Sequence, residues 1–298
     1  MSSLVDASCR PGPPAPASWR LRGRTVTLLR PLVMGVLNVT PDSFSDGGRW
    51  PTPEAACAHA ERLLGEGADL LDIGGESTAP GRAPIDADEE CRRVVPVVEA
   101  LARRHPHALL SVDTMKGRVA AAALEAGAHV INDVTGGRAD PALPAIVARH
   151  GAGLVLMHSR GAPGTLASYE HADYGDDVVP IVRRELAARR DAAVDAGVAR
   201  EAIVLDPGIG FGKRTPDAIA LLRALPTLAT LGHPLLVGVS RKRIIGDLTG
   251  IAEPEARLFG GLGAHVAAVA AGARLVRTHD VAATRQALDA AWPLLAPA

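Results

Sequence analysis

The sequence of 298 residues is poor in several residue types, and each shortage excludes a class of protein. Aromatic residues make up 3%, so a platform that stacks nucleic-acid bases is not expected. The formal net charge is −1 at pH 7, and no basic excess indicates binding to nucleic acid or to a membrane surface. No apolar run approaches the roughly 20 residues of a membrane-spanning helix. These shortages therefore argue against nucleic-acid-binding, membrane-surface and membrane-spanning proteins.

Cysteine is also scarce. Cys9, Cys57 and Cys91 are an odd, scattered set without a CxxC spacing. This pattern favours free thiols in a reducing compartment over a disulfide framework or a zinc site. The amino terminus has no basic segment followed by an apolar run, so it does not resemble a secretion signal. We therefore expect a cytoplasmic protein.

The domain organisation is simple. Residues 11–16 are rich in Pro and Ala, and we expect residues 1–18 to form a disordered tail. The segment WRLRGRTVTL at 19–28 predicts a short hairpin. Hydrophobic residues make up 47% of the chain, which is ample for one large core, and we predict a single domain over 19–298.

Short apolar runs, each ending in polar residues, recur along this domain. They span 32–38, 68–76, 109–114, 129–134, 153–159, 202–208, 234–240 and 274–280. The stretches between them have helical spacing, and several end in glycine, as helices commonly do. Eight strands alternating with helices predict a parallel sheet closed into a (β/α)8 TIM barrel. The alternative is an open doubly wound sheet, which more often has a glycine-rich turn after its first strand; here that strand ends in NVTP at 38–41.

In a barrel of this kind, residues at the carboxyl ends of the strands converge on one mouth. Asp113, Asn132, Asp206 and Lys242 come from the carboxyl ends of four different predicted strands, and Lys242 is one of only three lysines. Two carboxylates, an amide and an ammonium group can bind the donor and acceptor edges of a flat heterocycle. These residues are therefore candidates for recognising such a ring.

Arg277, His279 and Asn38 come from the carboxyl ends of the last and first predicted strands, which become neighbours when the barrel closes. Arginine suits a phosphate, and one amide oxygen is enough for a Mg²⁺ ion that takes its other ligands from water and a diphosphate. A heterocycle beside a diphosphate predicts substitution at a carbon that bears this leaving group.

Apolar side chains near the same strand ends are candidates to hold the faces of the ring. They are Val36, Met157, Leu236 and Phe211. The glycine-rich stretch at 208–213 resembles a phosphate-binding loop only weakly, because Lys213 is followed by Arg214 and not by Ser or Thr. We interpret its glycines as backbone room for a flat ligand.

Seven motifs occur in the order MGVLNVTPDSFSDGG, DIGGESTAPG, SVDTMKG, INDVTGG, DPGIGFGK, GVSRKRIIG and VRTHDV. Together they resemble the motif set of the dihydropteroate synthase family, over nearly the whole chain from about Leu32 to His279. The resemblance implies a pterin-binding TIM barrel that joins 6-hydroxymethyl-7,8-dihydropterin diphosphate to 4-aminobenzoate and releases diphosphate. It also implies Mg²⁺, a cytoplasmic homodimer and inhibition by sulfonamides, with no nucleic-acid or membrane partner.

The resemblance assigns candidate roles to individual residues. Asp113, Lys242, Arg277 and His279 would be catalytic. Asp113, Asn132, Met157, Asp206, Phe211, Gly238 and Lys242 would bind the pterin. Thr78, Pro80, Ser240, Arg277, Thr278 and His279 would bind the diphosphate and the 4-aminobenzoate, with Phe211 also near the latter, and Asn38 would bind the metal.

Two positions depart from the pattern of the family. Ala79 stands where the family typically has Arg, with Arg82 three residues further on, and Thr278 stands where Val is usual. The missing cation keeps a ligand-binding paralogue with weak activity open as an alternative. A pterin-dependent methyltransferase and an aldolase that forms a Schiff base on Lys242 are also compatible with the strand-end residues.

Overall fold

The computed structural model describes residues 18–40, 53–76, 84–175 and 177–295. The predicted tail up to residue 17 lies outside this range. Eight parallel strands form the centre of the molecule: β3 Leu32–Asn38, β4 Leu70–Gly74, β5 Leu109–Asp113, β6 Val130–Asp133, β7 Gly153–Met157, β8 Ile203–Asp206, β9 Leu236–Val237 and β10 Leu275–Thr278. Their order is β8-β7-β6-β5-β4-β3-β10-β9, and a parallel bridge between Leu205 and Leu235 joins the two edges. The predicted TIM barrel is confirmed.

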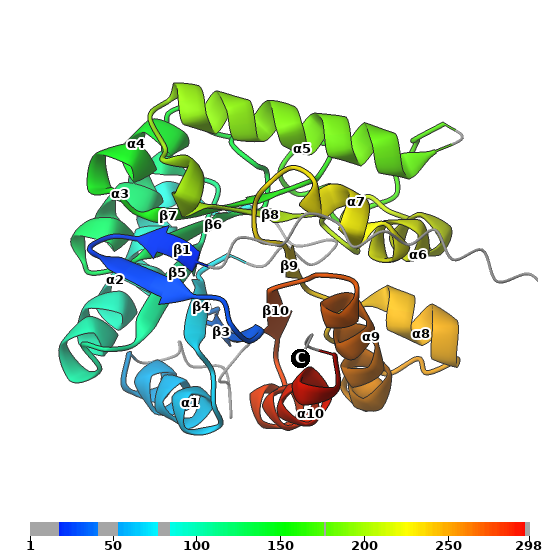
Figure 1. Cartoon of the computed structure of the whole chain (residues 1–298). Coiled ribbons are helices and arrows are strands. Elements are labelled where there is room, and N and C mark those ends of the chain that lie inside the picture. The colour runs from blue at the N-terminus through cyan, green and yellow to red at the C-terminus, as the bar shows by residue number, and fades with distance from the viewer. Residues whose placement is uncertain (1–17, 41–52, 77–83, 176, 296–298) are drawn as a thin grey trace, which may run out of the picture.

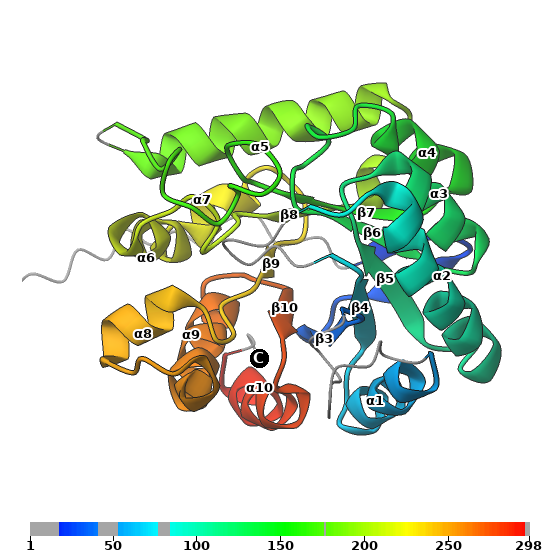
Figure 2. The ribbon, with the colours of Figure 1, turned by 180° about the vertical axis from the view of Figure 1, so that it is seen from behind.

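Helices surround this barrel in both views (Figures 1 and 2). They are α1 Pro53–Gly65, α2 Ala87–Arg104, α3 Gly117–Glu125, α4 Leu143–His150, α5 Val178–Asp195, α6 Thr215–Arg223, α7 Leu225–Ala229, α8 Arg243–Thr249, α9 Leu258–Ala270 and α10 Val281–Leu295, with short 3₁₀ turns at Arg200–Ala202 and Pro254–Arg257. Within the described residues, no helix combines the length and apolar character needed to cross a membrane.

Glycines end several of these helices. Gly67, Gly127, Gly197 and Gly272 follow α1, α3, α5 and α9 with φ values of 96°, 115°, 98° and 107°. These angles lie in the region that costs other residues steric strain, so glycine is the residue that allows the chain to turn back towards the next strand.

The strands have apolar side chains on both faces because each lies between the barrel interior and the helices. The outer faces and the helices share one large core, in which Leu37, Ile73, Val112 and Leu156 are fully buried. The strand predicted at 234–240 is much shorter in the structure than in the prediction. Only two of its residues, Leu236–Val237, pair with a neighbouring strand.

The predicted hairpin is confirmed as β1 Ser18–Leu21 and β2 Arg24–Thr27. It lies in front of the strands in Figure 1 and behind them in Figure 2, so it covers one end of the barrel. Trp19 and Leu21 pack there against residues at or near the amino ends of the strands, among them Leu32 and Leu109. The Trp19 indole N–H also donates to the carbonyl of Ala202 at 2.9 Å. The hairpin therefore closes the amino end and leaves the other end as the mouth.

We expect Trp19→Ala to lower the free energy of unfolding by about 3–5 kcal/mol, because the change opens a cavity under the barrel and removes a buried hydrogen bond. Urea unfolding monitored by circular dichroism measures this loss. Leu29→Ala is the control, since Leu29 is 74% exposed and its loss should have almost no effect. A loss as small as that of the control would show that the hairpin does not contribute to the core.

Candidate active site

The strand ends of the mouth lie in one layer. Parallel pairing sets Asn38 beside Gly74, Gly74 beside Asp113, and Asp113 beside Asn132. A Cβ atom on Gly74 would lie 3.7 Å from Asn38 Oδ1 and 3.7 Å from the Cβ of Asp113. Glycine therefore leaves open the space between the predicted metal ligand and the first predicted pterin carboxylate.

Beneath this layer, the buried carboxylate of Asp72 holds a network that crosses the barrel. Its Oδ2 accepts from Arg277 Nε at 2.6 Å and from Asn132 Nδ2 at 2.9 Å, and its Oδ1 accepts from the Ser111 hydroxyl at 2.7 Å. Arg277 also donates through Nη2 to Asp113 at 2.9 Å. Three of the predicted site residues are thus brought together by Asp72, a residue that the strand-end pattern did not indicate.

This network determines the chemistry that each group offers to a ligand. Because Asn132 Nδ2 is bound to Asp72, its amide oxygen is the group left to accept a hydrogen bond. Burial raises the pKa of the Asp113 carboxyl to about 7, the Arg277 guanidinium opposes this rise, and the Asp72 carboxylate adds to it. Asp113 can therefore change its charge near neutral pH, and its ionised form would accept from a ring N–H.

Asp206 and Lys242 form the other polar side of the mouth. Asp206 is buried, and its Oδ1 accepts from the backbone N–H of Gly208 at 2.6 Å. The Lys242 Nζ donates to the carbonyl of Ile209 at 2.5 Å and lies 4.9 Å from the centre of the Phe211 ring. The turn after β8 therefore holds the lysine and an aromatic face side by side.

Burial lowers the pKa of Lys242 to about 8, while the Asp206 carboxylate acts in the opposite direction. Burial also raises the pKa of Asp206, and Lys242 opposes this rise. Gly238 lies beside both cations of the site, since a Cβ there would be 3.4 Å from Arg277 Cβ and 3.7 Å from Lys242 Nζ. Burial thus moves the pKa values of Asp113, Asp206 and Lys242 towards neutrality.

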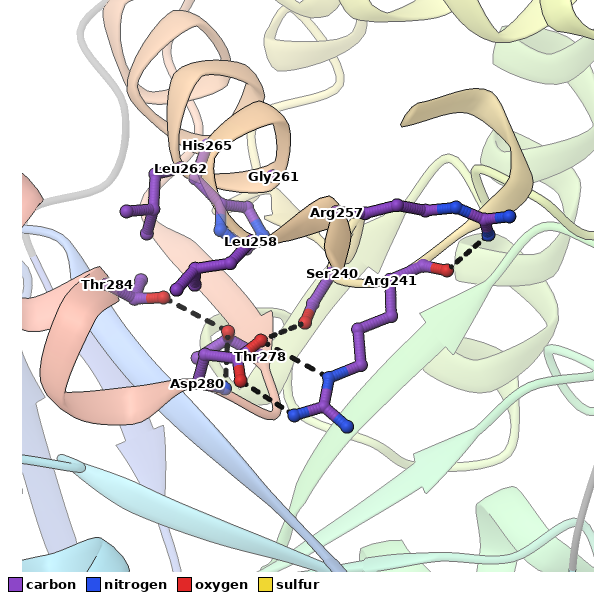
Figure 3. Close-up of a pocket in the computed structure, with 10 residues that line it drawn as sticks. All are labelled: Ser240, Arg241, Arg257, Leu258, Gly261, Leu262, His265, Thr278, Asp280 and Thr284. Carbon is purple, nitrogen blue, oxygen red and sulfur yellow. Dashed lines mark hydrogen bonds and ion pairs between the residues drawn. The ribbon is translucent and has the colours of Figure 1, made fainter. Parts of the chain in front are cut away.

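Hydrogen bonds and an ion pair join the residues that follow β9 to those that follow β10 (Figure 3). The Ser240 hydroxyl accepts from the His279 backbone N–H at 3.2 Å and lies 3.1 Å from its Nδ1. Arg241 pairs with Asp280 at 2.7 Å. Burial, with the charges of Arg277 and Arg241, lowers the pKa of His279 to about 4, so its ring is neutral at physiological pH.

The apolar candidates lie at different depths. Met157 is buried with Val134 and Leu166, and Phe211 packs against this group, which gives the mouth an apolar wall. Leu236 instead packs among the residues beneath the barrel, because β9 begins with it.

Thr278 is 1% exposed, and its hydroxyl lies 3.0 Å from that of Thr284 on α10. Figure 3 shows the Thr278 side chain beside Asp280 and below α9. The Thr278 hydroxyl thus contacts the first turn of α10.

Thr78 and Pro80, predicted to contact the diphosphate and the 4-aminobenzoate, lie outside the described residues, and so do Ala79 and Arg82. The same holds for the SFSDGG part of the first motif.

Asp72 could have been found from the sequence by one signal. It is the only charged residue inside an otherwise apolar strand, LLDIG, that is buried along its whole length. A carboxylate in such a strand must have partners, because an unpaired buried charge costs several kcal/mol. The sequence does not reveal that the main partner is Arg277, which lies 205 residues away.

The described residues contain no group of three or more His, Cys, Asp or Glu side chains that could hold a metal ion. Asn38 at the end of β3 is exposed and has open space beside its Oδ1. A single amide oxygen fits a Mg²⁺ ion that keeps several waters and bridges a substrate diphosphate. The residues that the structure describes therefore fit a metal that takes most of its ligands from outside the protein.

Comparison with known proteins gives the same ordered match. Residues 34–279 match the family described as pterin binding enzyme. The dihydropteroate synthase of Mycobacterium leprae is 46% identical over 267 residues, which cover 87% of this chain and 93% of that protein. An inactive dihydropteroate synthase 2 of Mycobacterium bovis is 44% identical over 273 residues, covering 90% of this chain and 84% of that protein.

Solved structures agree in fold. A Xanthomonas albilineans dihydropteroate synthase with 4-aminobenzoic acid superimposes with a TM-score of 0.86 at 50% identity, covering 94% of this chain and all of that one (100%). The X. albilineans enzyme in complex with 7,8-dihydropteroate superimposes with a TM-score of 0.83 at 48% identity, covering 94% and 100%.

We expect Asp72→Asn to lower the pKa of Asp113 below about 7, because the change removes a neighbouring negative charge that raises it. Carbon-13 NMR of aspartate-labelled protein across a pH series measures this titration. Asp69→Asn is the matched control, since Asp69 pairs with Arg30 and Arg285 before the start of β4. An Asp113 titration midpoint that stays unchanged in Asp72→Asn would contradict the coupling.

Proposed function

We propose, because this chain belongs to the dihydropteroate synthase family of pterin-binding enzymes, that it joins 6-hydroxymethyl-7,8-dihydropterin diphosphate to 4-aminobenzoate. The products would be 7,8-dihydropteroate and diphosphate. The bond between the pterin methylene carbon and the diphosphate oxygen breaks with its electron pair on the oxygen. The amine of 4-aminobenzoate supplies the pair for the new C–N bond and then loses a proton.

The observation that carries this proposal is the arrangement of Asp113, Asn132, Asp206 and Lys242 around one closed mouth. Asp113 and Asn132 come from adjacent strands, and Asp206 lies with Lys242 on the opposite part of the barrel. Such a set offers acceptors to ring and exocyclic N–H groups and a donor to a ring carbonyl, which are the groups of a pterin. Met157 and Phe211 would contact its faces.

The same carboxylates favour the reaction electrostatically. Loss of diphosphate leaves positive charge on the pterin methylene and ring. Ionised Asp113 and Asp206, held in place by buried hydrogen bonds, would stabilise that charge without reorganisation. Protonation of either carboxyl would weaken both binding and this stabilisation.

The diphosphate would lie towards the ends of β10 and β3. The Nε and Nη2 of Arg277 are bound to Asp72 and Asp113, so Nη1 is the part of the guanidinium left for a phosphate oxygen. Neutral His279 could donate a hydrogen bond to the same group. A Mg²⁺ ion on the Asn38 amide oxygen would supply positive charge for the leaving diphosphate.

The second substrate would lie near Ser240 and Phe211. The X. albilineans complexes with 4-aminobenzoic acid and with 7,8-dihydropteroate support this substrate class, since those chains cover almost the whole of this one. Sulfonamides would then compete with 4-aminobenzoate.

A second candidate function is binding of a pterin without turnover. It is favoured by the inactive M. bovis relative, which is nearly as similar to this chain as the M. leprae enzyme is. Ala79 in place of the usual Arg also favours it. The residues proposed to bind the pterin would be the same in both candidate functions. Only a measurement of turnover therefore distinguishes them.

We also propose a homodimer that pairs through α9. Residues 258–273 contain no Asp, Glu, Lys or Arg, although the helix lies on the outside of the barrel. Phe259 on α9 is 81% exposed and Leu248 on the neighbouring α8 is 57% exposed. A second copy of the chain, with the same uncharged helix, would cover both.

The free thiols of Cys57 and Cys91 support a reducing compartment such as the cytoplasm.

Purified protein with the pterin diphosphate, 4-aminobenzoate and Mg²⁺ is expected to release diphosphate only when both organic substrates are present. A coupled phosphate assay with pyrophosphatase measures the release, and a sulfonamide should reduce it in competition with 4-aminobenzoate. Calorimetric binding of the pterin without any release would instead establish the second candidate.

Two variants test the proposed roles of individual residues by their effect on ligand binding. Asp206→Asn should weaken binding of both the pterin diphosphate and the pterin alcohol by about tenfold or more, because it removes a charged contact. Arg277→Ala should weaken binding of the diphosphate more than that of the alcohol. Equal losses for both ligands in Arg277→Ala would contradict a phosphate contact by this residue.

Phe259→Glu is expected to convert a dimer into a monomer, because it places a charge in the centre of an apolar contact. Sedimentation velocity measures the mass. Leu29→Glu, a change at an exposed leucine before β3, is the control and should leave the dimer intact. A monomeric parent chain, or a Phe259→Glu variant that stays dimeric, would exclude this interface.

A further inference from the structure

Lys213 is a buried lysine that the proposed chemistry does not use. It is 2% exposed and is one of the largest fully buried side chains of the described residues. Lysine is rarely buried unless its charge is paired. Here no carboxylate of the described residues forms an ion pair with it, and its Nζ instead donates to the carbonyl oxygens of Phe211 at 2.9 Å and His158 at 3.1 Å.

These two carbonyls belong to different parts of the mouth. His158 directly follows β7, and Phe211 lies in the turn that follows β8. The Lys213 side chain therefore bridges the end of one strand and the loop of the next. Tyr174 covers it, with the ring centre 5.9 Å from Nζ.

The bridged turn has only two side chains of its own that pack, Ile209 in the core and Phe211 at the mouth. Gly208, Gly210 and Gly212 have φ values of 69°, 84° and 60°, which only glycine adopts without strain. A Cβ on Gly208 would lie 1.9 Å from the His158 carbonyl oxygen, so the turn lies directly against the end of β7. The glycines provide no side chains to pack, so beyond the side chains of Ile209 and Phe211 the position of the turn depends on hydrogen bonds to its backbone.

Two lysines donate hydrogen bonds to carbonyl groups of this turn. Lys242 donates to the carbonyl of Ile209, and Lys213 donates to the carbonyl of Phe211, two residues further along the turn. Displacement of the turn would therefore move both the partner of Lys242 and the ring that lies beside its ammonium group.

We propose that Lys213 is a positioning residue, which ties the turn at 208–212 to the end of β7 and so sets Lys242 and Phe211 for pterin binding. This inference rests on the proposed pterin-binding function. Burial lowers the pKa of Lys213 well below its ordinary value, with Asp206 opposing the change. The bridge needs two N–H donors, which both the ammonium group and the neutral amine provide, so it holds in either charge state.

Lys213→Met and Lys213→Gln separate the donors from the packing. Methionine keeps the unbranched apolar part of the side chain but donates no hydrogen bond, whereas glutamine keeps two N–H donors at its end. Binding of 6-hydroxymethylpterin to the full-length protein, measured by calorimetry, should weaken about tenfold in Lys213→Met. Lys213→Gln should restore most of the affinity. Equal affinity of Lys213→Met and the parent, or equal losses in the two variants, would overturn the inference.

A matched control separates this effect from a general loss of stability. Trp19→Phe also removes one buried hydrogen bond to a carbonyl, but at the opposite end of the barrel. It should leave the pterin affinity within about twofold of the parent even where its melting temperature falls as much as that of Lys213→Met. A loss of affinity in this control equal to that in Lys213→Met would overturn the inference.

Gly208→Ala decides the matter if Lys213→Met does not fold. Its Cβ would collide with the His158 carbonyl and push the turn away from β7 while Lys213 stays in place. Weaker pterin binding is expected, and unchanged binding would overturn the inference. A parent chain that does not bind the pterin would overturn both this inference and the proposed function, whereas normal binding by Lys213→Met would overturn only this inference.

Discussion

The mouth of the barrel depends on one partly buried cation, Arg277, shared between Asp72 and Asp113. A charge in this position costs several kcal/mol unless its partners are also buried and correctly placed. The two carboxylates come from β4 and β5, and the guanidinium comes from β10, so the network forms only when the barrel is closed. The same network orients Asn132 and raises the pKa of Asp113. Folding energy and ligand recognition therefore use the same contacts.

Lysine has an equally specific use on the other side of the mouth. The chain contains three lysines, and two of them, Lys213 and Lys242, hold the glycine-rich turn after β8 through its carbonyl groups. Glycine gives this turn the backbone conformations it needs but no means of fixing them. The turn is thus fixed by the buried side chain of Ile209 and by the hydrogen bonds of the two lysines.

Stability and chemistry are separated along the barrel axis. The amino end is closed by the hairpin, with Trp19 packed under the strands, and it contains apolar side chains almost throughout. The carboxyl end contains the buried acids and bases, whose burial moves the pKa values of Asp113 and Lys242 towards neutrality. The apolar packing at the amino end can offset the free-energy cost of burying these charged groups, because both ends belong to one continuous sheet.

The sequence by itself determined that strands alternate with helices in a parallel sheet, and its eight apolar runs favoured a closed barrel over an open sheet. It also determined that Asp113, Asn132, Asp206 and Lys242 follow strands. The tertiary structure alone decided which groups meet. Asp72 pairs with Arg277 across 205 residues, and Lys213, which does not fit the phosphate-loop pattern, is buried against two carbonyls. Such contacts depend on strand register and on depth inside the barrel, and neither is recorded in the local periodicity of a sequence.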